Sequence, residues 1–138
     1  MLALSVTAPD TMQEQTSFDE QKALEALRAA MAGKEDDPAD QVFKNVKVLG
    51  AVPAKRLLAI MRVGYARSLG VSCDHCHVAG DWASDEKESK RIARQMARMT
   101  RELNERVLPA IPEMAGKEPT VNCTTCHRGQ RKPALTLD

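Results

Sequence analysis

The segments 71–77, VSCDHCH, and 121–127, VNCTTCH, decide how this chain folds, because each carries a Cys-x-x-Cys-His motif. Every cysteine of the chain lies in one of the two motifs: Cys73, Cys76, Cys123 and Cys126. One such motif can arise by chance, but two that use all the cysteines are a strong signal. The chain therefore needs a chemistry that places two thiols and an imidazole in one short turn, twice.

Covalent attachment of a c-type haem needs this arrangement. Each of the two porphyrin vinyl groups takes one thiol, and the adjacent histidine lies under the iron as the proximal ligand. The sequence predicts two haem c groups. Their attachment residues and proximal ligands are Cys73, Cys76 and His77 for the first, and Cys123, Cys126 and His127 for the second.

Other cysteine chemistries explain the motifs less well. Two Cys-x-x-Cys pairs could form a tetrahedral zinc site, but a long helical segment separates them and zinc gives no role to a histidine after both. A thioredoxin-like dithiol requires a βαβ context, which this helical sequence lacks. Structural disulfides also leave His77 and His127 without a role.

The bulk composition excludes several classes of protein. With 20 basic and 19 acidic residues, the net charge of +1 gives no argument for nucleic acid. No apolar run is long enough to span a bilayer. The aromatic residues of the 138-residue chain are few: Phe18, Phe43, Tyr65 and Trp82. Because aromatics supply much of the apolar area of a small core, we expect the porphyrin rings to fill the interior.

Hydrophobic periodicity predicts an all-α fold, with helices at 17–34, 53–70 and 84–108. Ser17 and Glu20 have capping-box spacing, and Ser84 can cap the longest helix. Residues 42–50 are expected to be irregular, and residues 110–120 a loop with one turn. Two helices carry apolar stripes that we expect to be buried: Leu57, Leu58, Met61, Tyr65 and Leu69 on one, and Ile92, Met96, Met99, Leu103 and Val107 on the other.

The histidine count limits the sixth iron ligands. Apart from His77 and His127 the chain has only His75, which lies inside the first motif and cannot reach the far face of either ring. Methionine on a buried stripe is usually packing, but two irons with too few histidines favour one thioether for each. Met61 precedes the first motif, and Met96 or Met99 precedes the second. Four arginines could pair with haem propionates: Arg62, Arg67, Arg94 and Arg98.

From about residue 43 to 132 the chain resembles one half of the tetrahaem cytochrome subunit of photosynthetic reaction centres. The resemblance is carried by "KNVKVLG", "LLAIM", "GVSCDHCHVAGDWASD", "KRIARQMARMTRELN" and "CTTCHRGQ". In that family a helix before each motif supplies an axial methionine, and the resemblance implies Met61 for the first haem and Met96 for the second. The family has four motifs where this chain has two, so the chain resembles a single dihaem half.

These features predict a dihaem domain at 17–132, a flexible arm or signal remnant at 1–16 and a tail at 133–138. We expect a periplasmic or otherwise extracytoplasmic electron carrier that is not an enzyme, because haem is attached to cysteines outside the cytoplasm. Its partners would be redox proteins, such as a membrane-bound electron-transfer complex or a reaction centre, and not nucleic acid. Two alternatives stay open: a peroxidase-like dihaem enzyme with one open iron site, and a haem-based redox or gas sensor.

Overall fold

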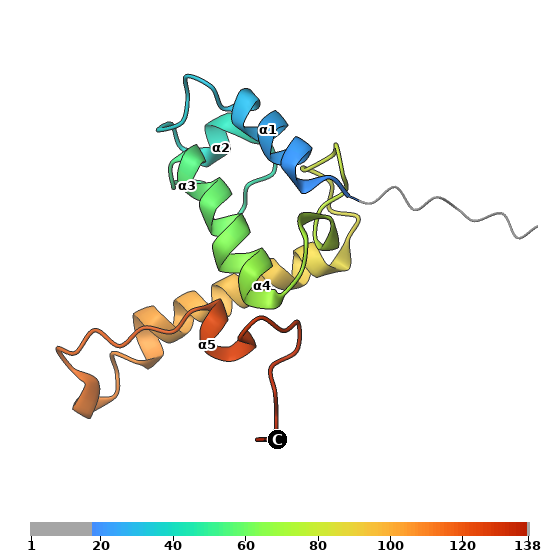
Figure 1. Cartoon of the computed structure of the whole chain (residues 1–138). Helices are drawn as coiled ribbons and strands as arrows, with labels where there is room; N and C mark the ends of the chain where they lie inside the picture. The colour runs from blue at the N-terminus through green and yellow to red at the C-terminus, as the bar shows by residue number, and fades with distance from the viewer. Residues whose placement is uncertain (1–17, 138) are drawn as a thin grey trace, which may run out of the picture.

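The computed structural model describes residues 18–137, and these are helical with no strand among them (Figure 1). The expected all-α fold is confirmed. The elements in chain order are α1 (Glu20–Ala30), α2 (Ala39–Val42), α3 (Ala54–Ala59), π-helix η1 (Ile60–Arg67), 3₁₀ turn η2 (Cys73–His75), α4 (Glu88–Glu102), π-helix η3 (Leu103–Val107), 3₁₀ turn η4 (Pro112–Met114) and α5 (Cys123–His127). The predicted arm at 1–16 and the predicted cap Ser17 lie outside the described residues.

Helix α1 begins at an aspartate cap. The side chain of Asp19 accepts a hydrogen bond from the backbone N–H of Lys22 at 3.0 Å, which satisfies one of the free donors of the first turn. After the helix, Gly33 adopts a φ of 76°, as expected for a residue that turns the chain out of a helix. Leu24 of α1 and Met31, the C-cap that follows the helix, are both buried.

Helices α2 and α3 start side by side. Ala39 N–H donates to the Val52 carbonyl at 2.8 Å, and Ala54 N–H donates to the Asp37 carbonyl at 2.9 Å. Both alanines are fully buried. Helix α2 was not predicted, whereas the irregular course of residues 43–50 was.

The second predicted helix forms at the expected place but changes type along its length. Pro53 is the N-cap of α3, and from Ile60 the wider π-helix η1 continues to Arg67. Gly70 then turns the chain with a φ of 64°. The hydrophobic period does not distinguish a π-helix from an α-helix, so the sequence could not predict this change.

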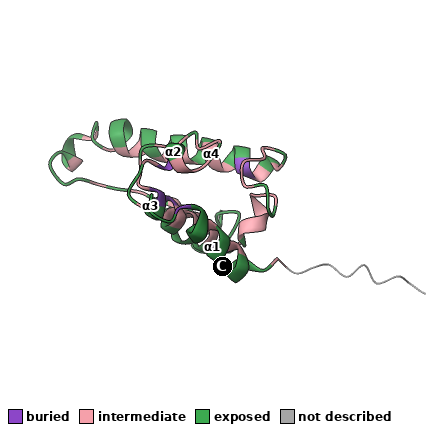
Figure 2. Ribbon diagram, turned by 90° about the horizontal axis from the view of Figure 1, so that it is seen from above, coloured by how far each residue is buried: buried purple, intermediate pink, exposed green. Residues whose placement is uncertain are grey.

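Helix α4 differs from its prediction in two ways. It begins at Glu88 and not near Ser84, whose hydroxyl accepts from Glu86 N–H in the preceding loop. Its apolar stripe is not buried: Ile92 is 53% exposed, Met96 39% and Met99 47%. The buried face of α4 is the adjacent one, where Lys90 lies. Figure 2 shows α4 as one layer and α1 with α3 as the other.

The core between these layers is small. Among the described residues, the buried hydrophobic side chains are Leu24, Met31, Ala39, Ala54 and Leu57, and no large side chain is fully enclosed. Residues 18–137 contain no helix that is long and apolar enough to cross a membrane. The space between the two layers is therefore not filled by a packed aromatic core.

Candidate functional site

A cavity lies between the two layers, with a volume of about 170 Å³. One water needs only roughly 10–15 Å³ on this measure, so the cavity has room for a much larger group. Its wall is mostly apolar and comes from α1, from residues 43–49, from α3 and η1, and from α4. The predicted apolar face of the second helix lines it throughout: Leu57, Leu58, Met61, Tyr65 and Leu69.

The residues predicted to hold the first haem all line this cavity. Cys73 and Cys76 come from η2 and the residue after it, His77 follows, and Met61 comes from η1. Two thiols, an imidazole and a thioether thus meet in one apolar space large enough for a planar organic group. This donor set fits a c-type haem.

The His77 ring is held by the segment that follows it. Its Nδ1 donates to the Trp82 carbonyl at 3.1 Å, and the two rings lie 5.5 Å apart at 57°. A ligating histidine usually donates its second ring N–H to a carbonyl, which fixes the tautomer and leaves Nε2 for the metal. Burial lowers the pKa of His77, which favours the neutral, ligand-competent imidazole.

The thiols of the first site are not built for redox exchange. Burial raises the pKa of Cys73 and of Cys76, and it also raises the pKa of Cys123. Reactive cysteines need the opposite shift, because the thiolate is the nucleophile. All four cysteines are free, and within residues 18–137 no three His, Cys, Asp or Glu side chains are grouped to hold a metal ion. The arrangement therefore supports neither the dithiol nor the zinc alternative.

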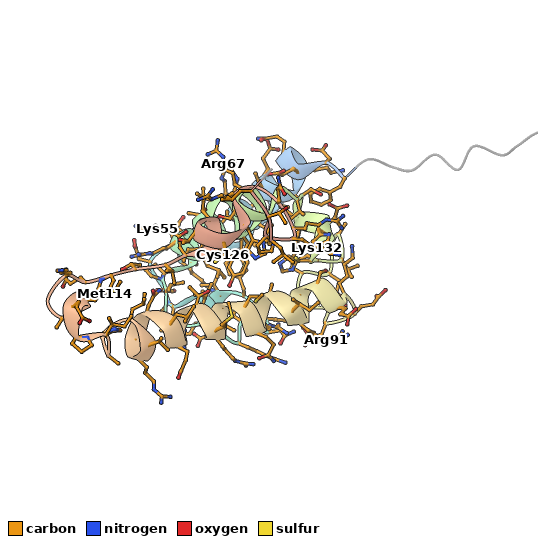
Figure 3. The ribbon with its side chains drawn as sticks, turned by 90° about the horizontal axis from the view of Figure 1, so that it is seen from below. Lys55, Arg67, Arg91, Met114, Cys126 and Lys132 are labelled. Carbon is orange, nitrogen blue, oxygen red and sulfur yellow. The ribbon has the colours of Figure 1, made fainter. Side chains whose placement is uncertain are left out.

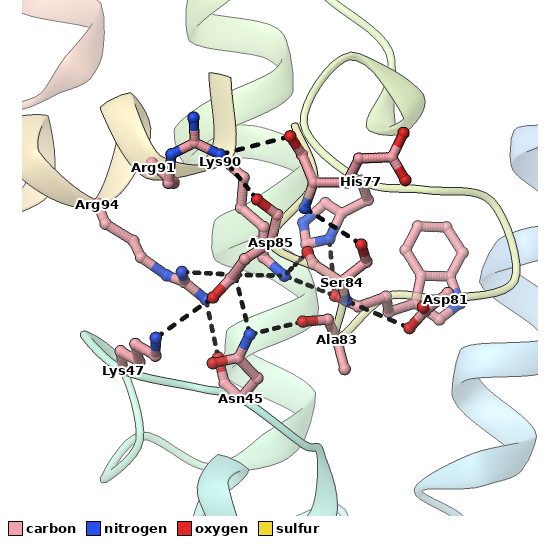
Figure 4. Close-up of polar contacts among 12 residues, drawn as sticks. Asn45, Lys47, His77, Asp81, Ala83, Ser84, Asp85, Lys90, Arg91 and Arg94 are labelled. Atoms are coloured by element: carbon pink, nitrogen blue, oxygen red, sulfur yellow. Dashed lines mark hydrogen bonds and ion pairs between the residues drawn. The ribbon is translucent and has the colours of Figure 1, made fainter. Parts of the chain in front are cut away.

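A polar cluster that the sequence did not predict lies beside the first motif (Figure 4). Asp85 is its centre: it accepts from Arg94 Nη1 at 2.7 Å and from Asn45 Nδ2 at 2.9 Å, and pairs with Lys47 at 3.3 Å. The Arg94 hydrogen bond holds the pKa of Asp85 well below its usual range. Asn45 and Lys47 lie about forty residues before Asp85 in the sequence, so no local pattern indicates the cluster. Arg94, which the sequence offers as a propionate partner, lines the cavity and also donates to Asp85 and to the Asn45 carbonyl.

The second motif forms helix α5, which starts with a capping box. Asn122 accepts from Thr125 N–H, and Thr125 Oγ1 accepts from Asn122 N–H. Nδ1 of His127 donates to the Gln130 carbonyl at 2.9 Å, as His77 does to Trp82. Arg128 ends the helix in the left-handed conformation, with a φ of 50°. Both predicted proximal histidines therefore keep Nε2 available.

The long helix is tied to the second motif at its far end. Asn104 in η3 donates to the Val121 carbonyl and accepts from Val121 N–H, both at 2.8 Å. Met96 and Met99 lie one to two turns earlier, on the exposed stripe. Neither methionine lines the first cavity. The exposed apolar stripe thus lies on the helix whose far end, at Asn104, is hydrogen-bonded to the segment that begins the second motif.

The two motifs are fixed to one another through the end of η1. Ser68 Oγ lies 2.6 Å from Thr124 Oγ1, and Gly129 N–H donates to the Ser68 carbonyl at 2.8 Å. Gly70 packs so closely that a Cβ there would lie 2.0 Å from the Gly129 carbonyl oxygen. Figure 1 shows α5 against the end of this helix.

Tyr65 lies between the two motifs. Burial raises its pKa to about 12, and the neighbouring Cys123 and Cys76 add to the rise. A cysteine of each motif is therefore close to the same phenol. Cys126 is the one exposed cysteine of the four, and Figure 3, seen from below, labels it at α5, across from α4.

The sequence matches the protein family described as "Photosynthetic reaction centre cytochrome C subunit" over residues 3–136. It is 31% identical over 122 residues to the photosynthetic reaction center cytochrome c subunit of Thermochromatium tepidum, which is 88% of this chain and 28% of that protein. It is 33% identical over 105 residues to the corresponding subunit of Roseobacter denitrificans, 72% of this chain and 27% of that protein.

A further relative is cytochrome c-554 of Chloroflexus aurantiacus. It is 35% identical over 83 residues, which is 60% of this chain and 20% of that protein. The chain thus spans about a quarter of the length of the curated relatives it matches. The match covers both Cys-x-x-Cys-His motifs and the helices before them.

Proposed function

Because the chain belongs to the family of photosynthetic reaction centre cytochrome c subunits, we propose that it is a c-type cytochrome that carries single electrons through two haem c groups. The observation that carries this proposal is the first cavity. There the chain brings Met61, Cys73, Cys76 and His77 together from separate segments in an apolar space. The family implies covalently bound haem c, and the second motif repeats the two thiols and the imidazole of the first.

At the first site Cys73 and Cys76 would hold the porphyrin, and His77 and Met61 would be the iron ligands. The Trp82 carbonyl orients the His77 ring. The apolar wall from α1 and α3 excludes water, which favours the less charged, reduced form of the group. Haem iron supplies one-electron redox chemistry when it is bound.

At the second site Cys123 and Cys126 would hold the porphyrin, and His127 would be the proximal ligand. The sixth ligand that we propose is Met96, with Met99 as its packing neighbour. The exposed stripe of α4 supports this placement, because an apolar face that includes both methionines needs a cover. A porphyrin ring held by α5 would supply it.

Ligation of each iron by histidine and methionine would leave no position for a substrate, so we propose an electron carrier and not an enzyme. A thioether ligand also raises the reduction potential relative to a second histidine. The partners that we propose are redox proteins outside the cytoplasm, including membrane-bound complexes such as a reaction centre.

Counting the haems tests the proposal. Protein made in cells equipped for cytochrome maturation should give a pyridine haemochrome spectrum that corresponds to two covalent haems per chain. A colourless protein would rule the proposal out, and one haem per chain would restrict it to one motif.

The sixth ligands are tested with three variants. Met61→Ala and Met96→Ala should each remove half of the weak far-red band of ferric haem with a thioether ligand, whereas Met99→Ala should keep it. If Met99→Ala removes the band and Met96→Ala does not, the two methionines exchange roles. A high-spin ferric spectrum in the wild type would favour the enzyme alternative with an open iron site.

A further inference from the structure

Lys90 is a buried cation beside the first motif, only 7% exposed. Its ammonium donates to the Trp82 carbonyl at 2.9 Å and to the Ser84 carbonyl at 2.6 Å, and it lies 3.5 Å from Asp85 (Figure 4). The Trp82 carbonyl also accepts from His77 Nδ1. One oxygen thus connects a buried positive charge to the imidazole of the first site.

Because Lys90 also donates to the Trp82 carbonyl oxygen, the hydrogen bond from His77 Nδ1–H to that oxygen is weaker. An ammonium that accepts electron density from the carbonyl leaves it a poorer acceptor for the Nδ1–H of His77. The imidazole then keeps its proton more fully and is a weaker donor through Nε2. A weaker proximal donor stabilises ferric iron less, so the reduction potential rises.

The charge of Lys90 acts in the same direction. Its nearest carboxylate, Asp85, is already paired with Arg94 at 2.7 Å and with Lys47 at 3.3 Å. Three cations thus share one anion, so the cluster stays positive. A positive charge away from water favours the less positive, reduced iron.

The second motif lacks this arrangement. The Gln130 carbonyl accepts a hydrogen bond from His127 Nδ1 at 2.9 Å. Within the part of the chain that the structure describes, no lysine donates to this carbonyl. Its neighbours Arg128, Arg131 and Lys132 are exposed, so solvent screens their charge.

We propose that Lys90 is a positioning residue that raises the reduction potential of the first site through the Trp82 carbonyl and the His77 imidazole, so that the first site is the more oxidising of the two. This inference rests on the proposed function, since it requires haem at both motifs. It assigns an order to two sites whose motifs are alike in sequence.

A spectroelectrochemical titration of the holoprotein tests it. Wild type should show two one-electron steps, and Lys90→Met should lower only the higher midpoint, by at least about 59 mV, which is a tenfold change in the equilibrium constant. The step that Met61→His also moves is thereby identified as the first site. Arg91→Met is the matched control: it removes the same charge from the next residue of α4, but Arg91 is exposed and donates to the Asp85 and Glu86 carbonyls.

Asp85→Asn should shift the higher midpoint potential in the opposite direction to Lys90→Met. Without the carboxylate, Lys90 and Arg94 lose their counter-charge, so the same midpoint should rise. If Lys90→Met does not retain haem, this variant decides: a rise supports the proposal and no rise overturns it. The proposal is also overturned if Lys90→Met leaves the higher midpoint in place, moves both steps equally, or matches Arg91→Met. Absence of haem from the wild type would instead overturn the proposed function.

Discussion

The two Cys-x-x-Cys-His motifs are alike in sequence but lie in different surroundings. The first opens into a cavity enclosed by α1, by residues 43–49, by α3 with η1 and by α4. The second is a five-residue helix, and the apolar stripe on the long helix before it is exposed, with Ile92 53% and Val107 46% exposed. The same motif therefore recurs in two surroundings, and the cavity beside the first is built by segments outside the repeat.

The largest difference between the two motifs is expected in the free energy of unfolding when the cysteine pair of each motif is replaced in turn. Cys73→Ala/Cys76→Ala should lower the free energy of unfolding by roughly 4 kcal/mol or more, as when a ligand bound far above its Kd is lost. The reason is that the cavity then has no filler between the layers. Cys123→Ala/Cys126→Ala should lower the free energy of unfolding less, and the helices around the first cavity should stay folded. Far-UV circular dichroism with thermal unfolding measures both.

The haem count is the control for this pair, because each double variant should drop from two covalent haems to one. Equal losses of helicity would show that enclosure does not distinguish the sites. The variant without all four cysteines should be largely unfolded, and native helicity in it would contradict the view that the cofactor completes the core.

The contact between the two motifs can be broken at Gly70. Gly70→Ala places a Cβ 2.0 Å from the Gly129 carbonyl oxygen at a φ of 64°, so we expect a loss of about 2–4 kcal/mol. Gly80→Ala is the matched control, because its φ is 81° but nothing lies within 4 Å of the new Cβ. It should cost only the left-handed strain, about 1–2 kcal/mol. Denaturant unfolding monitored by haem absorbance gives both values.

A smaller effect is expected at the hydroxyl pair that joins η1 to α5. Ser68 is 4% exposed, and its Oγ lies 2.6 Å from Thr124 Oγ1. A double-mutant cycle with Ser68→Ala and Thr124→Val should give a coupling free energy of about 0.5–1.5 kcal/mol. Additive losses would mean that the hydroxyls do not hold the motifs together.

The smallest effect is expected from acid at the Asp85 cluster, which belongs to the first site alone. Its carboxyl has a lowered pKa in the folded protein, so its stabilisation is complete above the ordinary carboxyl pKa of about 3.9. This stabilisation is lost as the pH falls from there toward the folded value. Wild type should exceed Asp85→Asn in unfolding free energy near neutral pH, and the gap should close below about pH 4. Partial exposure of the carboxyl keeps the effect small.

The sequence predicted the parts of the fold that local patterns control. The all-α class and the helices that carry Met61 and Met96 follow from period and turn residues. The face from Leu57 to Leu69 lines the cavity as expected. The start of α4 was misplaced because Ser84, a good capping residue, instead accepts from Glu86 N–H in the loop.

What the sequence did not predict depends on contacts between distant segments. The Asp85 cluster joins residues 45 and 47 to α4, and the buried Lys90 reads as a surface residue in a basic run. The stripe of α4 has the period of a buried face but no protein segment covers it among residues 18–137. A hydrophobic period shows that a face needs a partner, and it does not say whether the partner is protein.

The joint between the two attachment turns has a consequence for how such a chain can diverge. Its backbone part runs from Gly129 N–H to the Ser68 carbonyl, so it depends on the φ of 84° at Gly129 and not on a side chain. The spacing of the two motifs is thus set in part by main-chain atoms, and the outer surface can change while that spacing stays constant.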